Sequence, residues 1–182
     1  GGLPASLAAL PQFPVGPVPF RVGAFDDCVA AVIGAAGTGR GLAVHFANAY
    51  TIALADADPA YAALLSAPDA AVFTDGVPVT WFGRRFHPAV ADVWVRVYGP
   101  DVMEAVLGSA APLRHYLLGG SPETVADLQR AIATRWPEAI VVGAESPPFR
   151  ALTPAEQRAQ DERVRASGAD LVWVGLGTPK QD

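Results

Sequence analysis

Hydrophobic and polar positions alternate regularly from about residue 20 onward. Short, continuous apolar runs are separated by longer stretches in which apolar residues recur at helical spacing. We expect buried strands over residues 42–47, 70–74, 115–118, 139–142 and 171–174. Strands that alternate with helices in this way are typical of a parallel sheet with helices on both faces. The pattern therefore predicts an α/β protein, a single Rossmann-like domain with a mostly parallel, doubly wound sheet.

Residues that favour helix starts stand at the expected positions between these strands. A short polar side chain at an N-cap accepts hydrogen bonds from backbone N–H groups of the first helical turn. A Ser or Thr followed three residues later by Glu forms a capping box. The caps that we expect are Asp26 or Asp27, Asn48, Asp58 before Pro59, and Thr153 with Glu156.

The second expected strand ends at Asp75 and Gly76. An Asp-Gly pair between apolar runs commonly forms a tight hairpin. Pro78 argues against a hairpin, because proline donates no hydrogen bond to a sheet, whereas it is well suited to the first turn of a helix. We therefore expect a strand, a carboxylate at its carboxyl end and a helix that leaves from the same place. Ligands of open α/β sheets bind at such strand ends.

Two glycine-bearing turns follow later strands, at Gly119-Gly120-Ser121 and at Gly175-Leu176-Gly177. Free backbone N–H groups at a helix start favour an anion such as a diphosphate, although glycines can also simply make a tight turn. Neither turn matches the full dinucleotide fingerprint. Two cations, Arg96 and Lys180, are either solvated or in contact with an anion.

Other arrangements of polar residues give weaker indications of chemistry. Asp56 and Asp58 form the Asp-x-Asp pair that many sugar-nucleotide transferases use to hold a divalent cation. Asp58 has a local role as a helix cap, which we favour, so no metal site is expected. The histidines His45, His87 and His115 are too scattered in the sequence to indicate a ligand set.

Composition narrows the class of protein further. The chain has 182 residues, of which 51% are hydrophobic and 17% charged, enough for one sizeable core. Its formal net charge of -5 argues against a nucleic-acid partner. Cys28 is the only cysteine, which excludes an internal disulfide. Residues 1–20 carry no charge and contain many prolines, so we expect a flexible or extended lead-in before a domain over residues 21–182.

Several short motifs occur in a fixed order along the chain. They are Asn48-Ala49-Tyr50, Thr74-Asp75-Gly76, Arg96-Val97-Tyr98-Gly99-Pro100-Asp101, Leu118-Gly119-Gly120-Ser121 and the segment from Val174 to Asp182. This ordered set resembles the WecG/TagA/CpsF glycosyltransferases, which form glycosyltransferase family twenty-six. The resemblance runs from about Phe20 to the last residue.

The resemblance implies an inverting, metal-independent enzyme that needs no cofactor. It would transfer a sugar such as N-acetylmannosamine from a UDP donor to a polyprenyl-diphosphate-linked acceptor, in the synthesis of teichoic acid or another surface polysaccharide. Asp75 resembles the proposed catalytic base, which would take the proton of the acceptor hydroxyl. Positions that would bind the donor are Asn48, Gly76, Arg96, Gly119, Gly120, Ser121, Gly175, Gly177, Lys180 and Gln181.

The resemblance also implies a location and some differences from the family pattern. Family members act in the cytoplasm, peripheral to the inner face of the plasma membrane, and continue into a basic segment that meets the membrane. We expect this sequence to be truncated before that segment. The segment beginning at Glu145 replaces a Gly-Tyr/Phe-Phe motif, and Phe46-Ala47-Asn48 stands where Thr-x-Asn is common. A non-catalytic nucleotide-binding module is the alternative.

Overall fold

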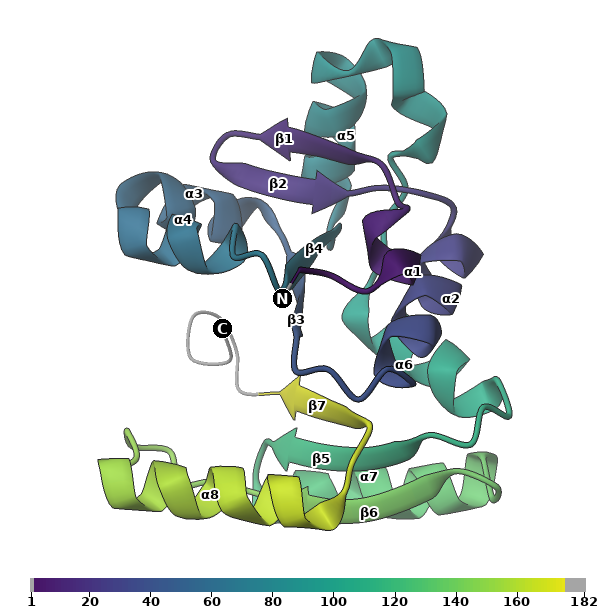
Figure 1. Ribbon diagram of the computed structural model, residues 1–182, viewed down its shortest axis with the longest axis vertical. Coiled ribbons are helices and arrows are strands. Elements are labelled where there is room, and N and C mark those ends of the chain that lie inside the picture. Colours follow the sequence, from purple (N-terminus) through teal and green to yellow (C-terminus); the bar gives the residue numbers. More distant parts are fainter. Residues whose placement is uncertain (1, 176–182) are drawn as a thin grey trace. The chain divides into compact units, whose positions relative to one another are not determined.

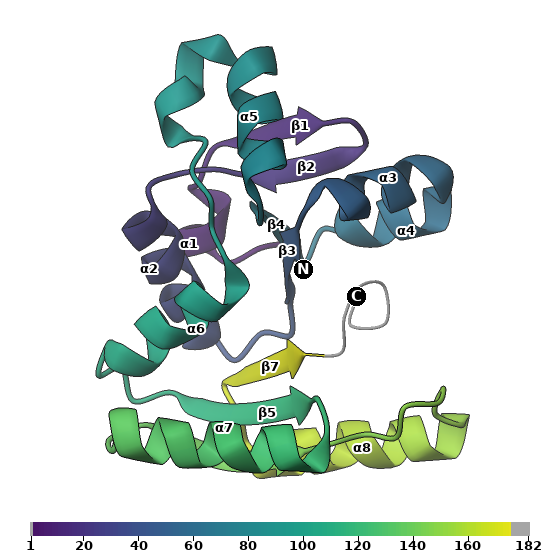
Figure 2. The same ribbon diagram turned by 180° about the vertical axis from the view of Figure 1, so that it is seen from behind.

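A computed structural model describes residues 2–175 of the chain. The chain divides into two compact units, one that extends to Ala105 and one that begins at Val106. Helix α6 (Gly99–Gly108) has residues on both sides of this division. We describe each unit by itself, and Figures 1 and 2 show the elements of each from opposite sides.

The first unit contains a four-stranded sheet in the order β1-β2-β4-β3. Its strands are β1 (Gln12–Val15), β2 (Val18–Arg21), β3 (Ala43–Ala47) and β4 (Ala70–Thr74). The first two form an antiparallel hairpin, and β2 and β3 each pair with β4 in parallel. The other elements are α1 (Ala5–Ala8), α2 (Phe25–Ala36), α3 (Ala49–Ala57), α4 (Pro59–Leu65), α5 (Val77–Phe86) and the 3-10 helix η1 (Pro88–Val93). Helices α3 and α4 lie side by side in both views (Figures 1 and 2).

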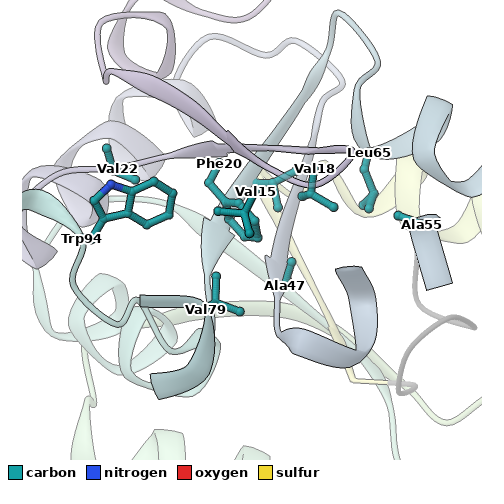
Figure 3. Packing of buried hydrophobic residues seen from close by; sticks show 10 residues of the cluster. Val15, Val18, Phe20, Val22, Ala47, Ala55, Leu65, Val79 and Trp94 are labelled. Carbon is teal, nitrogen blue, oxygen red and sulfur yellow. The ribbon is translucent and has the colours of Figure 1, made fainter. Parts of the chain in front are cut away.

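The hydrophobic core of this unit forms where the hairpin meets β4 and α5 (Figure 3). Trp94 is its largest side chain and is fully buried, with its ring edge-on to Phe20 at 6.1 Å between centroids. Gly83 of α5 lies directly against the Trp94 ring, and a Cβ atom there would overlap it. Burial of such a ring dominates the energy of a small core, so Trp94 fixes how α5 and the hairpin pack.

Residues 4–21 differ from the expected flexible lead-in. They form α1 and the β1-β2 hairpin, and Leu7, Val18 and Phe20 are fully buried. The prolines that suggested disorder are accommodated by the hairpin, where Pro14 lies opposite Pro19. Pro14 lies in the edge strand β1, where the missing N–H group of a proline is not needed.

The second unit contains a three-stranded parallel sheet in the order β6-β5-β7. The strands are β5 (Arg114–Gly119), β6 (Ile140–Glu145) and β7 (Leu171–Gly175), and the helices are α7 (Pro122–Arg135) and α8 (Pro154–Ser167). The register of β5 and β6 shifts between His115 and Tyr116. Gly143 leaves room for the Tyr116 ring at this irregularity, since a Cβ atom would overlap it.

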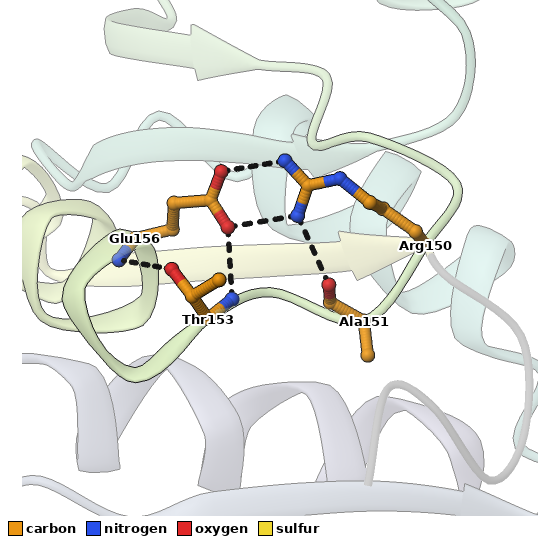
Figure 4. A network of polar contacts seen from close by, with 4 residues as sticks. All are labelled: Arg150, Ala151, Thr153 and Glu156. Atoms are coloured by element: carbon orange, nitrogen blue, oxygen red, sulfur yellow. Dashed lines mark hydrogen bonds and ion pairs between the residues drawn. The ribbon is translucent and has the colours of Figure 1, made fainter.

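The start of α8 is held by a polar network around Glu156 (Figure 4). Thr153 Oγ1 accepts a hydrogen bond from Glu156 N at 3.3 Å, and Glu156 accepts one from Thr153 N at 2.8 Å. Arg150 donates to both carboxylate oxygens of Glu156, at 2.8 and 2.6 Å. These bonds, with those of Arg150 foremost, lower the pKa of Glu156 to about 2. The predicted capping box is thus confirmed, with an arginine added to it.

The structure confirms the α/β class and the parallel strands predicted from the sequence. All the predicted strands are present, with ends that differ by at most three residues from those expected. They form two hydrogen-bonded sheets in place of one, because β3 and β4 pair in the first unit and β5, β6 and β7 in the second. The expected caps Asn48 and Asp58 are confirmed. Ala24, not Asp26 or Asp27, is the N-cap of α2, and both aspartates lie in its first turn.

The contact between Gly83 and Trp94 predicts a large effect of one methyl group. We expect Gly83→Ala to lower the free energy of unfolding by about 1–3 kcal/mol, because the added Cβ forces Trp94 from its place in the core. Gly41→Ala is the matched control, since a Cβ at Gly41 meets nothing within 4 Å. Urea unfolding measures both variants, and equal midpoints would contradict the prediction.

Candidate functional site

Asp75 and Asn48 lie at the carboxyl ends of two neighbouring parallel strands. Asp75 follows β4, and its backbone N–H donates to Ala47 O of β3 at 2.8 Å, which continues the ladder past the last strand residue. Gly76 then turns the chain with a φ of 130°, a conformation that favours glycine, and becomes the N-cap of α5. A Cβ atom at Gly76 would lie 3.7 Å from the Asn48 Cβ. The strand end and helix start expected at Asp75 are therefore confirmed.

Asn48 has a structural role that limits what it can bind. Its Oδ1 accepts hydrogen bonds from the backbone N–H groups of Tyr50 at 2.9 Å and Thr51 at 3.1 Å. Thr51 completes the capping box by accepting from Asn48 N at 3.2 Å. The side-chain NH2 group is the part of Asn48 that the cap does not use, so a ligand contact would go through this donor.

Arg96 reaches Asp75 from a segment that runs beside the end of β4. Val97 N donates to Thr74 O at 2.6 Å, and Thr74 Oγ1 donates to Val95 O. These two bonds place Arg96 next to the carboxylate, with Nη2 3.8 Å from Asp75 Oδ1. The Arg96 guanidinium also lies over the Tyr98 ring, at 4.1 Å from its centroid. Its side chain remains 47% exposed, so the same guanidinium can contact an anionic ligand.

The surroundings of Asp75 suit a carboxylate that accepts a proton. Burial raises the pKa of Asp75 above its ordinary value; the charge of Arg96 opposes this rise and that of Asp101 adds to it. The side chain is still 22% exposed and can therefore be reached by a ligand. A general base works best when its pKa lies near the working pH, and a raised carboxyl pKa moves in that direction.

A second group of predicted residues lies at the end of β5 in the other unit. Gly119 and Gly120 have φ values of 130° and 76°, and Ser121 caps α7 by accepting from Thr124 N at 3.1 Å. Gly119 also permits close approach of β7, because a Cβ there would lie 2.6 Å from Gly175 O. The turn thus leads into α7, and the positive φ values at Gly119 and Gly120 explain why both residues are glycine.

The start of α7 has polar neighbours of its own. Ser146 Oγ donates to Gly120 O at 2.7 Å, which ties the turn to the segment after β6. Glu123 in the first turn has a lowered pKa, chiefly because a backbone N–H group donates to it. An anionic ligand at the start of α7 would replace the Glu123 carboxylate or lie beside it. Both anions are stabilised by the free N–H groups of the first turn and by the positive end of the helix dipole.

The predicted site residues therefore fall into two groups. Asn48, Asp75, Gly76 and Arg96 come together in the first unit, and Gly119, Gly120, Ser121 and Gly175 in the second. Gly177, Lys180 and Gln181, also predicted to bind the donor, lie outside the described residues.

The structure adds residues that sequence reasoning missed. The Tyr98 ring lies under the Arg96 guanidinium. Residues two apart in an extended segment lie on the same side, so the spacing of Arg96 and Tyr98 in the sequence could have predicted this contact. Glu145 accepts hydrogen bonds from Tyr116 Oη at 3.0 Å and Gln160 Nε2 at 3.3 Å, and it pairs with Arg163. These bonds, that of Arg163 foremost, lower the Glu145 pKa. Residues from three elements make this network, so no local pattern revealed it.

Two features are absent from the part of the chain that the structure describes. Within residues 2–175, no group of three or more His, Cys, Asp or Glu side chains is arranged to hold a metal ion. No helix in that same range has the length and apolar character needed to cross a bilayer.

The site and the fold together define an α/β protein whose candidate ligand-binding groups lie at the carboxyl ends of parallel strands. Residues 13–182 match the model of the glycosyl transferase WecG/TagA/CpsF family, and the chain belongs to this family. The match confirms the resemblance seen in the ordered motifs, and it begins within β1, at Phe13. The reaction class is therefore transfer of a glycosyl group.

The pairing of Arg96 with Asp75 predicts the direction of a pKa change. Arg96→Gln removes the positive charge that lowers the Asp75 pKa, so we expect that pKa to rise further. Titration of the side-chain carboxyl by NMR measures the change. Arg40→Gln, at an exposed position before β3, is the control and should leave Asp75 unaltered. A fall in the Asp75 pKa in Arg96→Gln would show that the two groups do not interact as described.

Proposed function

We propose that the protein transfers a sugar from a UDP donor to a lipid-diphosphate-linked acceptor, with Asp75 as catalytic base. The observation that carries the proposal is the half-buried Asp75 carboxylate at a strand end, with a raised pKa and Arg96 3.8 Å away, in a chain of a glycosyltransferase family. The carboxylate is accessible enough to meet a hydroxyl and buried enough to hold a proton.

The chemistry follows from these properties. The acceptor hydroxyl oxygen attacks the anomeric carbon of the sugar, and its proton moves to Asp75 as the new glycosidic bond forms. UDP leaves with the electrons of the broken bond. A single displacement of this kind inverts the configuration at the anomeric carbon. Arg96, held in place by Tyr98 and the bonds around Thr74, keeps the carboxylate ionised before the attack.

The donor diphosphate needs groups that stabilise negative charge as UDP leaves. In this proposal the backbone N–H groups at Gly120 and Ser121, at the start of α7, supply part of that stabilisation, without a metal. Gly175 lies beside Gly119 at the same strand ends. Gly177, Lys180 and Gln181 complete the proposed donor contacts.

The transferred sugar is proposed to be N-acetylmannosamine-like, and the product a precursor of teichoic acid or another surface polysaccharide. Such an acceptor is embedded in a bilayer by its polyprenyl chain, so the reaction takes place at a membrane surface, on the cytoplasmic side. The protein would act there as a peripheral enzyme.

The role of Asp75 gives a direct test. We expect Asp75→Asn to lower the rate of transfer by about 10²–10⁴-fold, because an amide cannot take the proton of the acceptor hydroxyl. UDP binding should survive. The pKa of Asp75 is raised by folding, so its ionised form opposes folding at pH values above that pKa, and the variant should be at least as stable as the wild type at neutral pH.

Asp56→Asn is the matched control for this test, because Asp56 is an exposed carboxylate in the same unit, at the end of α3. Radiolabelled sugar transfer is measured for both variants, and thermal unfolding is measured alongside. Unchanged turnover in Asp75→Asn would refute its assignment as the base.

The nucleotide specificity of the donor site provides a separate test. Isothermal titration calorimetry should show saturable binding of UDP and UDP-sugars and none of NAD(H), because the glycine turns lack the dinucleotide fingerprint. Saturable NAD(H) binding without UDP binding would overturn the transferase proposal. Retained UDP binding with no transfer to any lipid-linked acceptor would favour a non-catalytic nucleotide-binding module.

A further inference from the structure

Helix α5 begins at the candidate site and exposes large apolar side chains to solvent. Val77 is 70% exposed, Trp81 60%, Phe86 61% and Phe82 38%. The rings contact one another, with Trp81 edge-on to Phe82 at 5.1 Å and Phe82 stacked on Phe86 at 6.0 Å between centroids. We call these four residues the α5 apolar face. It is a continuous patch and not a set of scattered exposed side chains.

The opposite side of α5 faces the core. Val79, Thr80 and Gly83 are buried, and Gly83 packs against Trp94. A surface helix normally carries a polar outer face opposite its buried side, whereas the outer face of α5 carries three exposed aromatic rings. The outer side of α5 therefore has the composition of a surface that contacts something other than water.

Charge on α5 indicates what covers this face. Arg84 and Arg85 are exposed in its last turn, and the helix sequence contains no acidic residue. Arg84 Nε donates to Trp94 O at 3.0 Å, which anchors its guanidinium beside the core. Asp92 in η1 is the next acidic residue along the chain. Exposed tryptophan and phenylalanine side chains flanked by arginine, without acidic residues, are typical of helices that lie in the interface of an anionic membrane.

We propose that the α5 apolar face docks the protein on the surface of an anionic lipid bilayer. The inference rests on the proposed function, in which the acceptor is lipid-linked. Gly76 is the N-cap of α5 and Asp75 precedes it, so Trp81 lies about 9 Å along the helix axis from the turn at Asp75, at 1.5 Å per residue. A bilayer on this face holds the head group of an embedded acceptor near the carboxylate.

Vesicle sedimentation tests the proposal with the purified chain. We expect binding to phosphatidylcholine vesicles that contain phosphatidylglycerol, and at least tenfold weaker binding by Trp81→Ala/Phe86→Ala. Leu64→Ala/Phe149→Ala is the matched control, since both residues are exposed apolar side chains elsewhere on the chain, at 40% and 93%. Arg85→Gln should weaken binding on the order of fivefold and reduce its salt dependence. Equal binding by wild type and the α5 double variant overturns the proposal, as does an absence of binding by the wild type.

A second measurement uses a variant that conserves the fold. Trp81→Phe keeps an aromatic ring, so it should stay folded and bound, but it should lose most of the fluorescence quenching by brominated lipids that the wild type shows. Unchanged quenching would show that Trp81 does not enter the bilayer. Light scattering identifies the rival occupant, because an oligomer that dissociates in Trp81→Ala/Phe86→Ala, with vesicle binding intact, would assign the face to a second copy of the chain.

A transfer assay separates this proposal from the proposed function. Trp81→Ala/Phe86→Ala should lose transfer to an acceptor embedded in vesicles and keep transfer to a short-chain, water-soluble acceptor. Loss of both activities at an unchanged thermal unfolding temperature would place these residues in catalysis and contradict a docking role. If the wild type binds vesicles through α5 but transfers to neither acceptor, the docking inference stands and the proposed function fails.

Discussion

The packing of Trp94 against Gly83 and Phe20 is the contact on which the first unit depends. Trp94 joins three segments distant in sequence, because the β1-β2 hairpin covers it, α5 supports it and the chain continues from it to Arg96. Val95 and Val97, which follow Trp94 in the chain, bond to Thr74 and bring the Arg96 guanidinium to Asp75. The segment that brings Arg96 to the candidate site is thus anchored at the buried Trp94 ring.

The same arrangement leaves the charge of Asp75 incompletely compensated, which opposes folding when the carboxyl group is ionised. Burial disfavours the charged form of Asp75, and a single partly exposed arginine offsets this only in part. By contrast, Glu145 and Glu156 have arginine partners and additional hydrogen bonds, and their pKa values are lowered. Carboxylates that serve stability and one proposed to serve chemistry are therefore distinguished by how fully their charge is compensated.

Local patterns were enough to predict the strands, the caps at Asn48, Asp58 and Thr153, and the position of Asp75 at a strand end. These features depend on neighbours a few residues apart, which a sequence displays directly. The β1-β2 hairpin was missed because its prolines outweighed its apolar residues, and the division into two sheets because strand pairing is not encoded locally. The approach of Arg96 to Asp75 was missed because it depends on hydrogen bonds between Thr74 and a segment 21 residues further along the chain. The function was predicted from the resemblance of the motifs to a known family, because hydrophobic periodicity predicts only the fold.

The pairing of Pro14 with Pro19 also affects how the sheet ends. Strand β1 is the outer strand of the sheet. Pro14 and Pro19 form a pair that exchanges no hydrogen bonds, and the backbone groups of Pro14 therefore point away from β2, toward the open edge. Pro14 has no N–H group to present on that outer side, and its carbonyl oxygen is 2.8 Å from His87 Nε2. The open edge of β1 therefore lacks one hydrogen-bond donor, and one of its acceptors, the Pro14 carbonyl oxygen, already contacts His87. A strand from another molecule finds fewer bonding partners there, which protects the protein against edge-to-edge aggregation.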